Sequence, residues 1–133
     1  MIEHDLEPGH PHRNLMRHEL AHALGALMAG ASMVRIHDDG ISWRSDPQWR
    51  DEPDEFRSLV GQLAGPHLVR SHASADDLFV MAVAPADLRA RVLAFVDKAV
   101  RPSLDRVSNA ELDQMAAKVA AGETVLLRRT PGH

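Results

Sequence analysis

The sequence contains no cysteine among its 133 residues. This absence excludes disulfide bonds, zinc sites built from thiolates and a cysteine nucleophile. Aromatic residues are also few, with two Trp, three Phe and no Tyr, so there is little to stack on nucleic-acid bases. The formal net charge is −4, which also argues against a nucleic-acid partner.

Long apolar runs are missing as well. The longest apolar stretches, 21–31 and 78–86, are shorter than the roughly 20 residues that a helix needs to span a bilayer. The first ten residues, MIEHDLEPGH, are acidic and polar, unlike a signal peptide. We therefore expect a cytoplasmic protein that has no membrane partner. Apolar residues make up 44% of the chain, which is enough for one core.

The residue pattern predicts a tail over 1–12, where prolines and a glycine interrupt any periodicity, and a single domain over 13–133. Within this domain the pattern predicts helices over 13–29, 54–71, 76–84, 86–100 and 109–121, with Gly65-Pro66 kinking or splitting the second. A hairpin is expected from strands at 32–37 and 41–43, and a last strand over 124–128. The fold class is α+β, mostly helical, with a small sheet. The C-terminal helices are expected to form core, and they could also support an oligomer.

The segment RHELAHAL, residues 17–24, contains His18-Glu19-x-x-His22. On a helix, positions i and i+4 bring two imidazoles within reach of one ion, and this motif is typical of zinc peptidases. A zinc ion makes water more acidic, and a neighbouring glutamate can take the proton and pass it to the leaving amine. The motif therefore predicts peptide-bond hydrolysis, with Glu19 as the general base.

The helix that carries this motif has two distinct faces at 100° per residue. One face is apolar and is expected to contact the core; it consists of Met16, Leu20, Ala23, Leu24 and Leu27. The opposite face carries the two histidines among small residues, namely Gly25, Ala26 and Ala29. We expect this second face to leave room for a metal ion and a substrate.

A catalytic zinc site takes three protein ligands, so two histidines need a third. The extended motif that ends in a third histidine is incomplete, because Met28 stands at that position and a thioether is a poor zinc ligand. The residues alone leave two alternatives open. The third ligand is either a glutamate of the following helix, Glu52 or Glu55, or an aspartate further along the chain.

Three segments follow one another along the chain in an order that can be compared with known families: HELAHALGALMAG (18–30), LVGQLAGPHLV (59–69) and SADDLFVMAV (74–83). This order resembles the peptidase domain of the FtsH-type zinc metalloproteases, and more closely its small stand-alone relatives in bacteria and phages. The resemblance implies a zincin-like domain in which His18, His22 and an aspartate bind one zinc ion. Alignment of Leu78 with the family's aliphatic residue makes Asp77 that aspartate, with Asp76 as the near alternative.

The expected activity is thus that of a zinc metalloendopeptidase. The ATPase module of the family is missing from this sequence, so we expect ATP-independent action on peptides or unfolded protein segments. The chain also departs from the family, which usually has Ala-Ala-Glu where residues 67–69 read His-Leu-Val. This departure supports an alternative function, a non-catalytic metal-binding or protein-interaction module derived from the peptidase fold.

The remaining candidates have plainer interpretations. His37, His67 and His72 are interpreted as polar residues at the ends of elements, and His4, His10, His12 and His133 as solvated residues near the termini. The strand over 33–37 is expected to lie at a sheet edge, where it could hold an extended substrate by main-chain pairing. The alternative is that this strand only covers the zinc helix.

Overall fold

The computed structural model describes residues 13–37, 40–45, 54–70 and 73–128. The expected tail over 1–12 and the hairpin turn at 38–39 lie outside these residues. The elements follow one another as α1 (Arg13–Met28), β1 (Ala31–His37), β2 (Gly40–Ser45), α2 (Asp54–Leu68), α3 (Ala75–Val83), α4 (Ala86–Phe95), η3 (Val96–Val100), α5 (Arg101–Asp105), α6 (Asn109–Ala120) and β3 (Val125–Arg128). The mostly helical α+β class is confirmed, as are the hairpin and the last strand.

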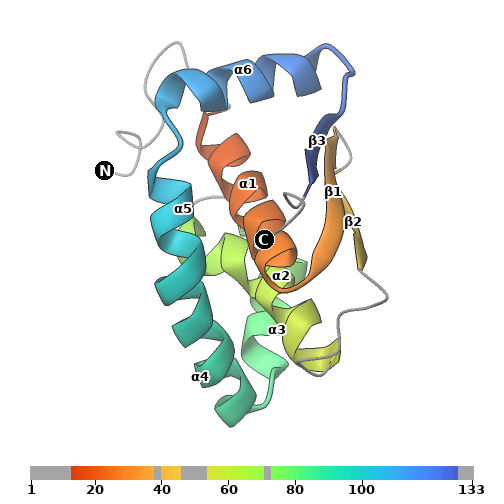
Figure 1. The fold of residues 1–133 in the computed structure, drawn as a ribbon. Coiled ribbons are helices and arrows are strands. Elements are labelled where there is room, and N and C mark those ends of the chain that lie inside the picture. Colours follow the sequence, from red (N-terminus) through yellow and green to blue (C-terminus); the bar gives the residue numbers. More distant parts are fainter. Residues whose placement is uncertain (1–12, 38–39, 46–53, 71–72, 129–133) are drawn as a thin grey trace, which may run out of the picture.

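Helix α1 runs through the middle of the molecule (Figure 1). The sheet lies along one side of it, α2 packs against another, and the column formed by α4, η3 and α5 lies on a third, with α6 across one end. Among the described residues, no helix is both long and apolar enough to cross a membrane.

The sheet has three strands in the order β2-β1-β3, and both pairs are antiparallel. β1 is therefore the central strand, with residues 33–36 paired to β3 on one side and to β2 on the other. The expectation that strand 33–37 lies at a sheet edge and pairs with substrate was wrong. Its backbone groups are already used, because β3 returns from the end of the chain to pair with it.

The apolar face of α1 contacts the core, as its periodicity predicts. Met16, Leu20 and Ala23 are buried and pack with Val34 and Ile36 of β1 in one apolar cluster. A second cluster is centred on α2 and on the α4–η3 column; its most buried members are Val60, Leu63, Ala64, Val92, Val96 and Val100. α1 thus separates two clusters of core side chains.

The histidine face of α1 is not open, which corrects the expectation that it leaves room for a substrate. His18, His22, Gly25 and Ala26 are all buried, because α2 packs directly on this face. Small residues permit the close approach. A β-carbon added at Gly25 would lie 2.8 Å from Cβ of Ala64 and 2.9 Å from the carbonyl oxygen of Val60.

Two prolines lie within helical segments, and neither of them ends the helix in which it lies. Pro66 lies inside the last turn of α2, which continues to Leu68, so the helix is not split. Between α4 and α5 the chain forms the π-helical segment η3, where the N–H of Arg101 donates to the carbonyl of Val96 five residues earlier. Pro102 explains this widening, because its ring would clash with the carbonyl four residues before it.

The ends of the helices confirm several expectations. Gly30 and Gly122 follow α1 and α6 with φ of 117° and 83°, in the left-handed region that favours glycine. Ser108 and Glu111 form the predicted capping box at the start of α6. Arg13 ties the start of α1 to α6 through a two-point ion pair with Asp113, at 3.0 and 2.8 Å.

The close packing at Gly25 leads to a stability prediction with a definite sign. Helix propensity alone would make Gly25→Ala stabilising by about 0.5–1 kcal/mol. Overpacking against α2 costs about 1–3 kcal/mol, so we expect a net loss of up to about 2.5 kcal/mol. Urea unfolding measured by circular dichroism tests this prediction. A variant more stable than the wild type would show that α1 and α2 accommodate the added methyl group, which would contradict the expected overpacking.

Candidate metal centre

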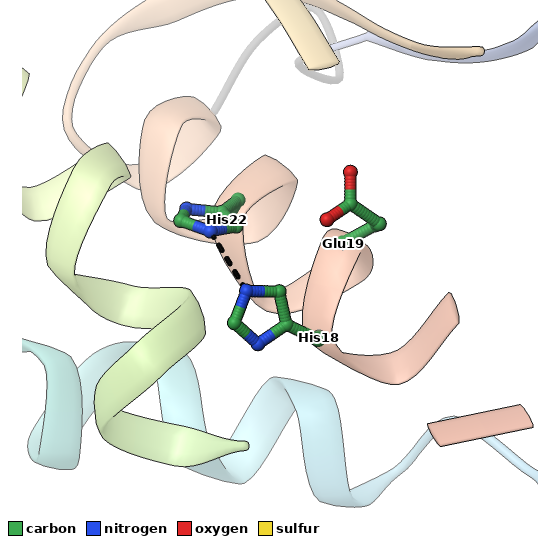
Figure 2. A group of neighbouring side chains, drawn as sticks. All are labelled: His18, Glu19 and His22. Carbon is green, nitrogen blue, oxygen red and sulfur yellow. Dashed lines mark hydrogen bonds between the residues drawn. The ribbon is translucent and has the colours of Figure 1, made fainter. Parts of the chain in front are cut away.

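His18 and His22 lie one turn apart on α1, and both rings are turned toward α2 (Figure 2). Helical spacing places their rings side by side, with centroids 4.8 Å apart. His18 is 2% exposed and His22 is 9% exposed. Histidines so deeply buried require partners for their ring nitrogens, because an unpaired buried polar atom costs about 1–3 kcal/mol.

The Nδ1 atom of each ring has such a partner on the neighbouring segment. Nδ1 of His18 lies 2.7 Å from the carbonyl oxygen of Val69, and Nδ1 of His22 lies 2.8 Å from that of Gly61. A carbonyl oxygen only accepts hydrogen bonds, so each Nδ1 must carry a proton and donate it. In the neutral ring, Nε2 then carries no proton and presents a lone pair.

The two Nε2 atoms lie 3.1 Å apart (Figure 2). With both Nδ1 atoms protonated, the neutral rings would direct two lone pairs at each other inside the protein. This repulsion is relieved only if a further proton makes one ring an imidazolium, or if a cation lies between the nitrogens. The carbonyl partners therefore prepare both rings to share a positive charge, and backbone carbonyls play this part behind metal-bound histidines.

A carboxylate completes the group. Asp77, in the first turn of α3, places Oδ2 3.2 Å from Nε2 of His18 and Oδ1 3.6 Å from Nε2 of His22. Its side chain is 17% exposed. Two ring nitrogens and a carboxylate thus converge from two helices, although 59 residues separate His18 from Asp77.

The separations of these atoms suit a small metal ion. A tetrahedral zinc ion holds nitrogen and oxygen ligands at about 2.0–2.2 Å, which places the ligand atoms roughly 3.3 Å from one another. The observed separations of 3.1, 3.2 and 3.6 Å fall close to this value. Imidazole and carboxylate are also ligand types that zinc accepts, so the donor set fits the ion.

Glu19 lies beside the rings on the next position of α1 (Figure 2). One of its carboxylate oxygens and one nitrogen of each histidine lie within 4.8 Å of one another, and these three residues could hold a metal ion. Its side chain is partly exposed, unlike the two rings. A carboxylate at this distance is also placed to hydrogen-bond a water molecule next to the rings.

Gly65 of α2 provides the space in front of the His22 ring. A β-carbon at this position would lie 2.7 Å from Cε1 of His22 and closer still to Nε2. Any residue other than glycine would therefore collide with the His22 ring at the edge that carries Nε2. The sequence pattern assigned this glycine, with Pro66, to a helix kink, and its contact with His22 was not foreseen.

The other residues weighed from the sequence lie elsewhere. Asp76 and Glu55 are exposed, and of the three acidic candidates described it is Asp77 that contacts both rings. His37 is partly buried at the end of β1. Glu52, His72 and the histidines near the termini lie outside the described residues.

His67 pairs with the α4–η3 column rather than with the other histidines. Its Nε2 lies 3.0 Å from Oδ1 of Asp97 in η3, which also accepts from Arg101 at 2.6 Å. The hydrogen bond from Arg101, followed by that from His67, lowers the pKa of Asp97 despite some desolvation. His67 therefore links the end of α2 to η3.

Comparisons of the chain with models of protein families, with curated proteins and with solved structures found no match.

The contact at Gly65 predicts the behaviour of one variant of the expected zinc site. Gly65→Ala should lose zinc binding, since the added methyl group meets the His22 ring, while His18, His22 and Asp77 all remain. Gly122→Ala is the control, because Gly122 follows α6 with φ of 83° and alanine strains the fold there without any contact with the histidines, so this variant should still bind zinc. Titration of the folded variants with zinc and a chromophoric chelator measures this, and equal affinities would contradict it.

Proposed function

We propose that this chain is a zinc-dependent metallopeptidase with one zinc ion bound by His18, His22 and Asp77. One observation carries the proposal: two Nε2 atoms and a carboxylate converge within 3.1–3.6 Å, and each ring is held by a backbone carbonyl at its other nitrogen. Three acceptors without a shared positive charge would repel one another, and a divalent cation satisfies all three.

The metal would polarise a substrate carbonyl and make a nearby water molecule more acidic. The residues of the chain divide the remaining work. His18 and His22 hold their orientation through their bonds to Val69 and Gly61, and Asp77 supplies a negative charge from a second helix. Because the two histidines lie on the packed helix α1 rather than on a loop, they can keep their geometry during a reaction.

Glu19 is proposed as the general base. Its carboxylate lies beside the histidines and is partly exposed, so it can take a proton from water and later pass it to the leaving amine. Removing such a group typically slows the reaction by about 10²–10⁴-fold.

One observation favours the alternative, a metal-binding module without catalytic activity. His18 and His22 are 2% and 9% exposed, and a structural metal site is closed by protein ligands, whereas a catalytic one keeps a position for water. Asp77 and Glu19 are each partly exposed, which supports access of water to these two carboxylates. The two functions differ in whether Glu19 matters for a reaction.

Metal content tests the ligand set. Protein purified without chelators and without a histidine tag should contain about one zinc per chain by mass spectrometry, as in three-ligand catalytic sites. His22→Ala and Asp77→Ala should each lose it, whereas Glu55→Ala and Asp76→Ala serve as matched controls and should retain it. A wild type that stays free of metal after zinc is added back would refute the proposed function.

Catalysis is tested with Glu19→Gln, which keeps the size of the side chain and removes its basic function. We expect this variant to bind zinc like the wild type and to cleave fluorescein-labelled casein at least about a hundredfold more slowly. Glu123→Gln is the matched control, since Glu123 is exposed in the segment between α6 and β3.

The outcomes separate the two functions. Cleavage that is lost in Glu19→Gln and retained in Glu123→Gln supports the peptidase. Full activity of Glu19→Gln would show that the proposed base is wrong. Zinc binding without cleavage by the wild type would favour the non-catalytic module.

A further inference from the structure

The residue that precedes α3 is bonded to the same carboxylate that faces the histidines. Ser74 is the N-cap of this helix, with φ of −79° and ψ of 169°. Its backbone N–H donates to Oδ2 of Asp77 at 3.0 Å, and its hydroxyl accepts from the N–H of Asp77 at 3.0 Å. Oδ2 is also the oxygen that lies 3.2 Å from Nε2 of His18.

Two reciprocal bonds therefore fix both the backbone and the side chain of Asp77. The hydroxyl of Ser74 fixes the first turn of the helix, and its N–H fixes the carboxylate so that one oxygen is shared between Ser74 and His18. Aspartate has one fewer rotatable bond than the glutamate or glutamine that usually occupies this position of a capping box. The shorter side chain leaves fewer conformers in which the carboxylate turns away from the rings.

Helix α3 depends strongly on this cap because it has little other anchorage. None of its residues is fully buried, and Leu78, Phe79 and Val83 are more than half exposed. Val80 and Met81 contact the second core cluster only as partly buried side chains. Because α3 makes few buried contacts, its first turn, which includes Asp77, depends on the capping box for its position.

We infer that Ser74 is the positioning residue of the metal site, and that its capping box with Asp77 orients the third ligand toward His18 and His22. This inference rests on the proposed zinc site. Groups that orient a ligand in this way commonly change metal affinity by about 10–100-fold when they are removed. Ser74→Ala keeps the backbone N–H and removes only the hydroxyl, so the lower end of that range is expected.

The chain contains its own control for this experiment. α6 begins with the same arrangement, in which Ser108 bonds reciprocally to Glu111 at 3.0 and 3.1 Å. Glu111 is exposed and is not among the residues of the metal group. Ser108→Ala therefore removes a comparable cap, together with a bond from the Ser108 hydroxyl to Oε1 of Glu111 at 3.0 Å, without touching an acidic ligand.

The experiment measures zinc affinity by competition with a chromophoric chelator, together with the midpoint of thermal unfolding without metal. We expect Ser74→Ala to bind zinc about tenfold more weakly, Ser74→Thr to restore the affinity, and Ser108→Ala to stay within about twofold of the wild type. A lower unfolding midpoint is expected for both alanine variants, so stability alone would not distinguish them.

Each contrary result has a separate meaning. If Asp77→Ala loses zinc while Ser74→Ala keeps the wild-type affinity, the inference about Ser74 is overturned and the proposed site stands. If Ser74→Ala and Ser108→Ala weaken binding equally, the effect is one of general stability and the inference is overturned. If the wild type binds no zinc, or Asp77→Ala binds it normally, the proposed site fails and the inference fails with it.

Discussion

The contact between α1 and α2 is the constraint on which the rest of the structure depends. Glycine and alanine at the interface let the two helices approach so closely that a β-carbon at Gly25 would overlap Ala64. This approach brings the carbonyl of Gly61 to His22 and that of Val69 to His18. The same packing that closes the core thus determines which nitrogen of each ring carries a proton. A wider separation would leave both rings without their carbonyl partners and free to rotate.

This arrangement has an energetic consequence for the folded chain. Two bare Nε2 atoms and a carboxylate at 3.1–3.6 Å repel one another unless they share a positive charge. A cation bound only by the folded state would remove that repulsion and stabilise the fold, by about 2.7 kcal/mol at a hundred times its dissociation constant. On this proposal, the repulsion among these three groups in the metal-free protein and their affinity for the ion have the same cause. Gly65 belongs to the same packing, because a β-carbon at this position would collide with the His22 ring.

Much of this fold follows from local patterns that the sequence displays. The apolar stripe of α1, the capping box at Ser108 and the glycines after α1 and α6 each depend on neighbouring residues, and the structure agrees with all of them. The pairing of His18 with His22 is also local, since helical spacing alone places them together.

The errors concern contacts between residues distant in the chain. The pairing of β3 with β1 and the packing of α2 on the histidine face involve partners that no local pattern specifies. The choice among Asp76, Asp77 and Glu55 has the same origin, because only the placement of α3 brings one carboxylate to the rings. The sequence did carry a signal for Ser74, since Ser-x-x-Asp has the spacing of a capping box, but an aspartate at the last position makes the pattern easy to miss.

The absence of cysteine bears on what such a site could do. A zinc ion surrounded by thiolates is neutralised by its ligands, which suits a structural role. Two neutral imidazoles and one carboxylate would leave a divalent cation with a net positive charge. Glu19 and Asp77 are partly exposed, unlike the two rings, so a polar molecule would reach the group at its carboxylates. The chemistry of the ligands therefore favours an ion that still attracts an oxygen atom, while the deep burial of the rings keeps competing ligands away.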